Sequence, residues 1–226
     1  MPLVQPDEML RQSKSASVLE TLKRQIMLGQ LLPGEPLIEM EVARNFGCSQ
    51  GTVREALLKL RDEGLVYRQG HKGTRVSECG HDEAIEMFLV RRGIETRGMM
   101  RAVGSGDATL VNDIKDLVRA MEDASRLGDE YRQTQFDRAF HQRLFSAAQL
   151  PALEPILDRC LLHNHRYKIV IDTGPRDLKV QASRHWSIVE AIESGDVGRA
   201  VAAIGHHIET IIDLGPAIFE VRGASA

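Results

Sequence analysis

Residues 39–64 read EMEVARNFGCSQGTVREALLKLRDEG, and this segment predicts two helices joined by a tight turn. The first helix is expected to end at Gly47, because glycine readily adopts the left-handed conformation that follows many helices. Ser49 is a good N-cap for the second helix, since its hydroxyl can accept a hydrogen bond from the backbone N–H of Gly51 or Thr52. The segment therefore has the layout of a helix-turn-helix.

The second helix of this segment has one apolar face and several polar ones. Its apolar residues recur at spacings of four and three and predict a buried stripe, formed by Val53, Leu57 and Leu60. In a helix-turn-helix the first turns of this second helix present side chains to base edges in the major groove. The residues that we expect to contact DNA are Ser49, Gln50, Thr52 and Arg54. The alternative is an ordinary helical hairpin with a solvated basic face.

Two short strands are predicted after the helix-turn-helix, at residues 65–69 and 74–76. Glycines bound the turn between them, which is the pattern of a β-hairpin. His71 and Lys72 lie in that turn and give it a cation, so we expect them to reach phosphate or the minor groove. The hairpin would then form a wing beside the second helix.

The run PGEPLIEMEVARNFGCSQGTVREALLKLRDEGLV, at residues 33–66, resembles the winged helix-turn-helix of GntR-type bacterial transcription regulators. The similarity extends over residues 17–77, and TVREAL followed by L-x-x-EGLV is its most diagnostic part. Two positions differ from the family pattern. Gln50 and Gly51 stand where members often have an arginine, and Met40 replaces a basic residue of some members. The resemblance therefore implies the fold but leaves the base preference open.

The composition is that of a globular protein built mainly from helices. The 226 residues suffice for one large domain or two of ordinary size, and an aromatic content of only 4% favours helix packing over a β-sandwich. No run approaches the ~20 apolar residues of a membrane span, so we expect no membrane partner. Three widely spaced cysteines, Cys48, Cys79 and Cys160, indicate neither a disulfide framework nor a zinc knuckle, so we expect a cytoplasmic protein.

Charge is distributed unevenly along the chain. The net charge is −3, but residues 44–75 hold seven Lys and Arg against three acids, whereas residues 81–226 hold 18 against 22. A basic patch at one end of an acidic chain is typical of a DNA-binding head joined to a domain with another task.

After a short polar linker the chain is predicted to be entirely helical. Six segments have apolar periodicity and proper stop signals, and they predict a bundle of six to seven helices. These segments are residues 83–103, 110–127, 129–148, 153–171, 179–194 and 197–214. The predicted fold is mainly α: a flexible tail (1–14), a winged helix-turn-helix (15–77), a linker (78–82) and an all-α bundle (83–226).

Four polar residues of the bundle fall on helix faces that are otherwise apolar, where they need a reason to be buried. Asp137 and His141 lie one turn apart on one helix, and His185 and His207 lie on the apolar faces of two others. One carboxylate and three imidazoles form a ligand set for a divalent transition metal such as Zn²⁺, Ni²⁺ or Mn²⁺. The alternative is a group of core histidines that are simply hydrogen-bonded.

The bundle also resembles the ligand-binding domain of the FadR-like (FCD) branch of the GntR family. The similarity is carried by DRAFHQRL, by RHWSIVEAIESGD and by the A-x-x-A-I-x-x-H run that ends at His207. It implies a metal held by Asp137, His141, His185 and His207 that helps to bind a small carboxylate effector. RRGIE resembles the family's Arg-x-x-x-Glu, which implies that Arg91 contacts the effector and that Glu95 is its structural partner.

These features predict a ligand-responsive transcription regulator rather than an enzyme. We expect a homodimer that binds a palindromic operator in double-stranded DNA, with a small organic acid as effector and a metal-assisted pocket in the bundle. One alternative is a metal sensor, in which the ion itself is the signal. Another is a metal-dependent hydrolase with a nucleic-acid-binding module, but no motif places a separate general base.

Overall fold

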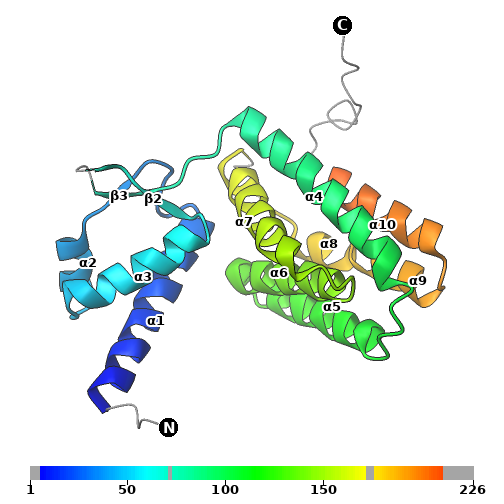
Figure 1. Cartoon of the computed structure of the whole chain (residues 1–226), viewed down its shortest axis with the longest axis horizontal. Helices are drawn as coiled ribbons and strands as arrows, with labels where there is room; N and C mark the ends of the chain where they lie inside the picture. Colours follow the sequence, from blue (N-terminus) through cyan, green and yellow to red (C-terminus); the bar gives the residue numbers. More distant parts are fainter. Residues whose placement is uncertain (1–5, 71–72, 172–175, 211–226) are drawn as a thin grey trace, which may run out of the picture. The chain divides into compact units, whose positions relative to one another are not determined.

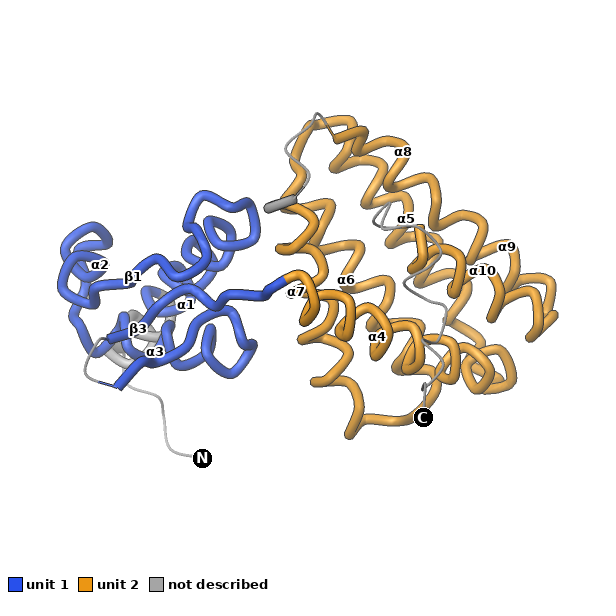
Figure 2. The backbone as a smooth tube through the Cα atoms, turned by 90° about the horizontal axis from the view of Figure 1, so that it is seen from above, with its two compact units in different colours: residues 1–80 blue, residues 81–226 orange. Residues whose placement is uncertain are grey.

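The computed structural model describes residues 6–70, 73–171 and 176–210. The chain forms two compact units, Met1–Gly80 and His81–Ala226 (Figure 2). The first holds three helices and a small sheet, and the second is helical throughout its described residues (Figure 1). This agrees with the predicted mainly α fold.

The first unit is built on the packing of its two longest helices. These are α1 (Pro6–Met27) and α3 (Gln50–Asp62), and the shorter α2 (Glu39–Asn45) also packs against α3. The predicted stripe of α3 is buried, together with apolar residues of α1; the set is Val18, Leu22, Ile26, Val53, Leu57 and Leu60.

The helix α1 begins earlier than predicted. A tail was expected up to residue 14, but the helix starts at Pro6. Proline suits the first position of a helix, because its fixed φ is already helical and its missing N–H is not needed there. No further proline or glycine then interrupts the chain before the helix ends.

The turn between α2 and α3 has the predicted geometry. Gly47 has a φ of 57°, a conformation that costs glycine little. The Ser49 hydroxyl accepts a hydrogen bond from the backbone N–H of Thr52 at 3.2 Å and so caps α3.

The wing contains one strand more than predicted. The hairpin strands β2 (Val66–Arg68) and β3 (Thr74–Val76) are antiparallel, with Tyr67 opposite Arg75. A third strand, β1 (Pro36–Leu37), pairs with the other edge of β3 and gives the order β1-β3-β2. A strand of two residues, one of which is a proline, has no alternating pattern, so only the pairing with β3 reveals it.

The second unit is a bundle in which several helices pack side by side. Figure 1 shows α4 beside α10, and contacts also join α4 to α7, α5 to α6 and α6 to α7. The described elements are α4 (His81–Ala102), α5 (Leu110–Arg126), α6 (Glu130–Ser146), η2 (Pro151–Leu153), α7 (Glu154–Ile171), α8 (Leu178–Ser183), α9 (Trp186–Glu193) and α10 (Val197–Glu209).

The predicted helix over residues 179–194 is two helices, α8 and α9, which meet at Arg184 and His185. The Ala182 carbonyl lies 3.3 Å from the His185 backbone nitrogen and 3.1 Å from its Nδ1. This tighter turn interrupts the regular hydrogen-bond ladder of an α-helix. The predicted helix over residues 197–214 is seen as α10, and residues 211–214 lie outside the described part of the chain.

None of the helices in the described ranges is long and apolar enough to cross a membrane. No disulfide joins Cys48, Cys79 and Cys160.

Gly98 in α4 lies where a side chain has no room. A Cβ atom there would lie 2.6 Å from Cδ2 and 2.8 Å from Cε2 of Phe145, whose ring is packed in the core with Leu157 and Leu161. We expect Gly98→Ala to lower the free energy of unfolding by about 1–3 kcal/mol through overpacking. Gly93→Ala on the same helix meets open space and should raise it, by up to ~1 kcal/mol. Urea unfolding followed by circular dichroism measures both, and an unchanged midpoint for Gly98→Ala would contradict the expected clash.

Candidate functional site

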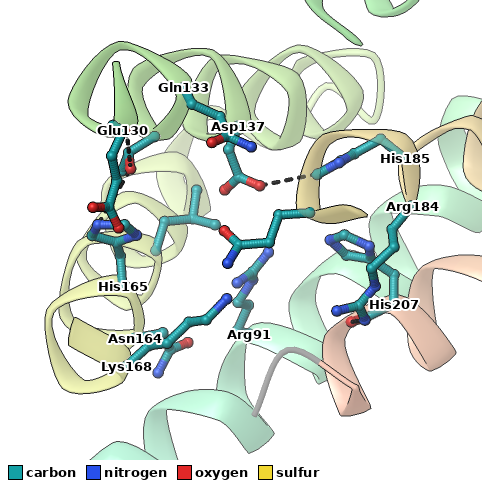
Figure 3. Close-up of a pocket in the computed structure, with 13 residues that line it drawn as sticks. Arg91, Glu130, Gln133, Asp137, Asn164, His165, Lys168, Arg184, His185 and His207 are labelled. Atoms are coloured by element: carbon teal, nitrogen blue, oxygen red, sulfur yellow. Dashed lines mark hydrogen bonds and ion pairs between the residues drawn. The ribbon is translucent and has the colours of Figure 1, made fainter. Parts of the chain in front are cut away.

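The bundle brings the four predicted metal-ligand residues together. Asp137 and His141 come from α6, His185 from the junction of α8 and α9, and His207 from α10. One ligand atom from each lies within 4.8 Å of all the others, and the three imidazoles are buried. Figure 3 shows Asp137, His185 and His207 converging on one pocket.

One imidazole of this cluster, that of His207, has no hydrogen-bond partner among the described residues. His185 Nε2 lies 3.0 Å from Asp137 Oδ1, and the ring centroids of His185 and His207 are 4.4 Å apart. Among the described residues, neither ring nitrogen of His207 has a hydrogen-bond partner. A buried imidazole N–H without an acceptor is unfavourable, so His207 has the environment of a ligand rather than of a core residue.

The pKa shifts favour the protonation state that a metal requires. Burial, with the neighbouring rings of His185 and His141, holds the pKa of His207 well below its usual value. Burial also lowers the pKa of His141, and the Glu95 carboxylate only partly offsets this. Burial alone would raise the pKa of Asp137, but the hydrogen bond with His185 and nearby positive charge outweigh it, and the pKa is well below its usual value. Neutral imidazoles and an ionised carboxylate are what a divalent metal binds.

Arg91, Glu95 and His141 form a closed buried network beside the cluster. Arg91 Nε donates to Glu95 Oε1 at 2.5 Å, and Arg91 Nη2 lies 2.9 Å from His141 Nε2. Because a guanidinium only donates, Nε2 of His141 accepts, and Nδ1 carries the proton that bonds to Glu95 Oε2 at 2.5 Å. Burial would raise the pKa of Glu95, but its interactions with His141 and Arg91, hydrogen bonds among them, lower it to about 2.

This network fits a metal site in one respect and opposes it in another. A carboxylate that accepts from the far nitrogen of a histidine fixes its ring for metal binding, and Glu95 is placed to do this. The near nitrogen of His141, however, already accepts from Arg91. Its lone pair serves one partner at a time, so a metal ion there excludes this bond.

A cavity of about 60 Å³ opens beside the cluster. Its walls carry the cations Arg91, Lys168 and Arg184 and the acids Asp137 and Glu130 (Figure 3). Both acids are engaged, Asp137 by His185 and Glu130 by Arg176 at 2.6 Å, and the cation Arg91 is likewise engaged by Glu95. With three cations against two acids, the lining has a positive balance that favours an anionic ligand.

Sequence analysis missed two polar residues of this cavity, Gln133 and Asn164. His165 faces the cavity and lies 3.2 Å from the Thr134 hydroxyl. Gln133 precedes Asp137 by four residues and therefore lies on the same face of α6, a spacing that could have identified it. Residues 163 and 206 differ in burial: His163 is buried, and His206 is exposed.

The candidate DNA contacts of the first unit differ in exposure. Gln50 is exposed, and the Arg54 side chain is 62% exposed with its Nε 2.6 Å from Glu39 Oε2. Thr52 is buried, and its hydroxyl shares a hydrogen bond with that of Ser49 at 3.0 Å. This places Ser49 and Thr52 in the helix cap. The predicted wing contacts, His71 and Lys72, lie outside the described residues.

Comparison with known proteins identifies both units. Residues 14–76 match the bacterial regulatory proteins of the gntR family, and residues 86–210, more than half of the chain, match the FCD domain. A "Probable D-xylose utilization operon transcriptional repressor" of Paenarthrobacter nicotinovorans is 26% identical over 201 residues, which are 88% of this chain and 87% of that protein. The "HTH-type transcriptional repressor NagR" of Bacillus subtilis is 37% identical over 102 residues, 44% of this chain and 42% of that one. The solved structure of E. coli McbR/YncC has the same fold, with a TM-score of 0.70 at 21% identity over 87% of this chain and 93% of that one.

His165 should make the metal-free protein sensitive to acid. Burial lowers its pKa to about 4, so between pH 6.5 and 4 the unfolded chain binds a proton that the folded chain does not. Stability present at neutral pH is therefore lost as the pH falls through this window. In chelator-treated protein, His165→Gln should flatten the slope of unfolding free energy against pH by up to ~1.4 kcal/mol per pH unit. The exposed His206→Gln is the control, and parallel slopes for His165→Gln and the unsubstituted protein would refute the assignment.

Proposed function

The chain belongs to the GntR family of bacterial regulatory proteins and carries an FCD domain, and from this premise we propose how it regulates. It is a DNA-binding transcription regulator, and its relatives are regulators rather than enzymes. The hydrolase hypothesis is therefore set aside. We propose that a divalent metal in the bundle helps to bind a small carboxylate effector, and that this effector changes the affinity for an operator.

The observation that carries the metal proposal is the buried cluster of Asp137, His141, His185 and His207. Neutral imidazoles suit Zn²⁺ or Ni²⁺, and the carboxylate also suits Mn²⁺. Such an ion supplies a fixed positive charge that can polarise and hold an acid. The unpartnered nitrogens of His207 support this role, because a metal is the partner that they otherwise lack among the described residues.

The effector proposal rests on Arg91 and the charge of the cavity. Arg91 is buried at the wall of the cavity and next to the metal-ligand cluster. A planar guanidinium can bind a carboxylate through two parallel hydrogen bonds, which makes it suited to orient an organic acid. With a metal and Arg91 on one carboxylate, the rest of the ligand would extend toward α6 and α7.

The DNA proposal places two recognition helices of a homodimer in successive major grooves of a palindromic operator. Gln50 and Arg54 are the exposed candidates for base contacts, with His71 and Lys72 of the wing as phosphate or minor-groove contacts. Acting on the chromosome, the regulator would work in the cytoplasm. An effector changes DNA affinity only to the extent that it binds two states of the dimer differently.

A metal sensor is a second candidate, and one observation favours it. Since Arg91 holds the lone pair of His141, metal binding would itself rearrange the network. The metal content of the purified protein separates the two uses: a resident cofactor should be largely loaded, whereas a signal ion should be largely absent.

His207→Ala should remove most of the metal. With metal at about 100 times its dissociation constant, a bound ion stabilises the folded chain by ~2.7 kcal/mol, and the variant should lack this increment. Elemental analysis after dialysis and thermal unfolding with and without added Zn²⁺ measure the two effects. His206→Ala, at the exposed neighbouring position, should keep both metal and increment. Full metal occupancy in the His207→Ala protein would overturn the assigned site.

Arg54→Ala should weaken operator binding by ~1–3 kcal/mol if Arg54 contacts a base. The operator can be selected from random duplexes with the purified protein and titrated in a gel-shift assay. The control is Arg61→Ala, two turns later on α3, which should have a smaller effect because the first turns of the recognition helix face the bases. Equal affinities of the Arg54→Ala and unsubstituted proteins would exclude α3 as the base-reading helix in this orientation.

A further inference from the structure

Gly51, the second residue of α3, is an exposed glycine that the folded chain does not itself require. Its φ is not positive, unlike that of Gly47 in the preceding turn. A Cβ atom at Gly51 would meet Ser49 Oγ at 3.6 Å, which is an ordinary van der Waals contact. Apart from the two chain neighbours and the backbone of α3 itself, no other described atom would lie within 4 Å of it. Neither the backbone conformation nor the packing at this position therefore excludes alanine.

The flexibility of glycine is not used at this position either. The Ser49 hydroxyl accepts a hydrogen bond from the Thr52 backbone N–H at 3.2 Å, and the two hydroxyls share a hydrogen bond at 3.0 Å. These bonds span Gly51 and hold the first turn of α3 in its helical conformation. Glycine destabilises a helix relative to alanine, so the chain loses stability at position 51 without a gain inside the fold. The open space at Gly51 therefore indicates a contact made outside the chain.

Gly51 shares a face of α3 with Arg54, the exposed candidate for a base contact, because three residues separate them. Arg54 Nε donates to Glu39 Oε2 at 2.6 Å, which leaves the two terminal nitrogens of the guanidinium for a base. Such a pair of donors matches O6 and N7 of a guanine. Arg54 would then set the register of α3 in the major groove, and Gly51 would face a neighbouring base pair.

The size and chemistry of the open space limit what fills it. A Cβ atom fits at Gly51, so the space admits one methyl group. Among the base edges of the major groove, only that of thymine carries a methyl group. The side of Gly51 that a Cβ would occupy carries only hydrogen, which suits an apolar group. The polar edge groups of the other bases are better matched by the side chains of Gln50 and Arg54.

We infer that Gly51 selects thymine in each operator half-site, because its missing side chain leaves room for the 5-methyl group. The inference rests on the proposed function, which places α3 in the major groove. Packing of that methyl group against the Cα of Gly51 removes apolar surface from water. A side chain at position 51 would occupy the same space and exclude the methyl group. Gly51 thus determines specificity through shape rather than through a hydrogen bond.

Uracil differs from thymine only in lacking the 5-methyl group, so it tests this contact directly. An operator selected from random duplexes is titrated with the full-length protein in a gel-shift assay, and each thymine is replaced in turn by uracil. At one position in each half-site the replacement should weaken binding about fourfold, which corresponds to one buried methyl group. The same replacement in both half-sites should weaken binding about tenfold or more.

Gly51→Ala places a methyl group where that of the thymine is expected. The variant should bind the thymine operator about fivefold or more weakly than the unsubstituted protein, because two methyl groups then compete for one space. Uracil at the same position should restore most of this loss. Uracil should therefore weaken binding of the unsubstituted protein and strengthen binding of the variant, a reversal that a general loss of affinity does not produce.

Gly93→Ala is the matched control, because it also adds a methyl group in open space but lies on α4 of the second unit. It should keep the preference for thymine over uracil. Urea unfolding shows that both variants are folded, and the uracil series on the unsubstituted protein needs no variant.

The outcomes separate this inference from the proposed function. Selected operators without a thymine common to both half-sites overturn the role of Gly51. A preference for thymine over uracil that is the same in the Gly51→Ala and unsubstituted proteins also overturns it, since the alanine then does not meet the methyl group. In both cases the proposed reading of bases by α3 is judged separately, by the operator affinity of the Arg54→Ala protein.

Discussion

Three imidazoles buried around one point are the constraint on which the second unit depends. Protonating His141 or His207 would place a charge beside neighbouring rings at a buried position, and the lowered pKa values of both express this. The rings of His141 and His207 are therefore neutral, and among the described residues neither ring nitrogen of His207 has the hydrogen-bond partner that it needs. Three separate parts of the bundle, α6, the α8–α9 junction and α10, converge to create this need. A bundle chosen only for stability would place aliphatic side chains here, so the cluster indicates function.

The Arg91–Glu95 pair follows from the same constraint. A buried ion pair gains little stability once both charges have been removed from water, so its presence indicates another role. Glu95 fixes the proton of His141 on Nδ1, and Arg91 holds the opposite nitrogen. A metal at His141 and the bond to Arg91 exclude each other at that nitrogen. The guanidinium next to the cavity is therefore linked to the metal-ligand cluster through one shared atom.

The fold and the ligand set could be predicted because both depend on local spacing. The cap at Ser49, the stripe of Val53, Leu57 and Leu60 and the pair Asp137 and His141 are all fixed by helix periodicity, and the structure agrees with them. The strand β1 and the break at His185 could not be predicted in this way. The strand exists only through its pairing with β3. The break arises because the Ala182 carbonyl bonds both the backbone nitrogen and the ring of His185.

The amides of the cavity show where such prediction ends. The spacing of Gln133 from Asp137 places it on the right face of α6, but a polar residue there could equally be satisfied by its neighbours. Its nitrogen donates to the carbonyl of Leu178, 45 residues away in the chain, and its oxygen has no donor among the residues that the structure describes. Asn164 is oriented in the same way by Ala84, 80 residues away. The orientation of these side chains therefore depends on long-range backbone contacts, and such contacts leave no periodic pattern in the sequence.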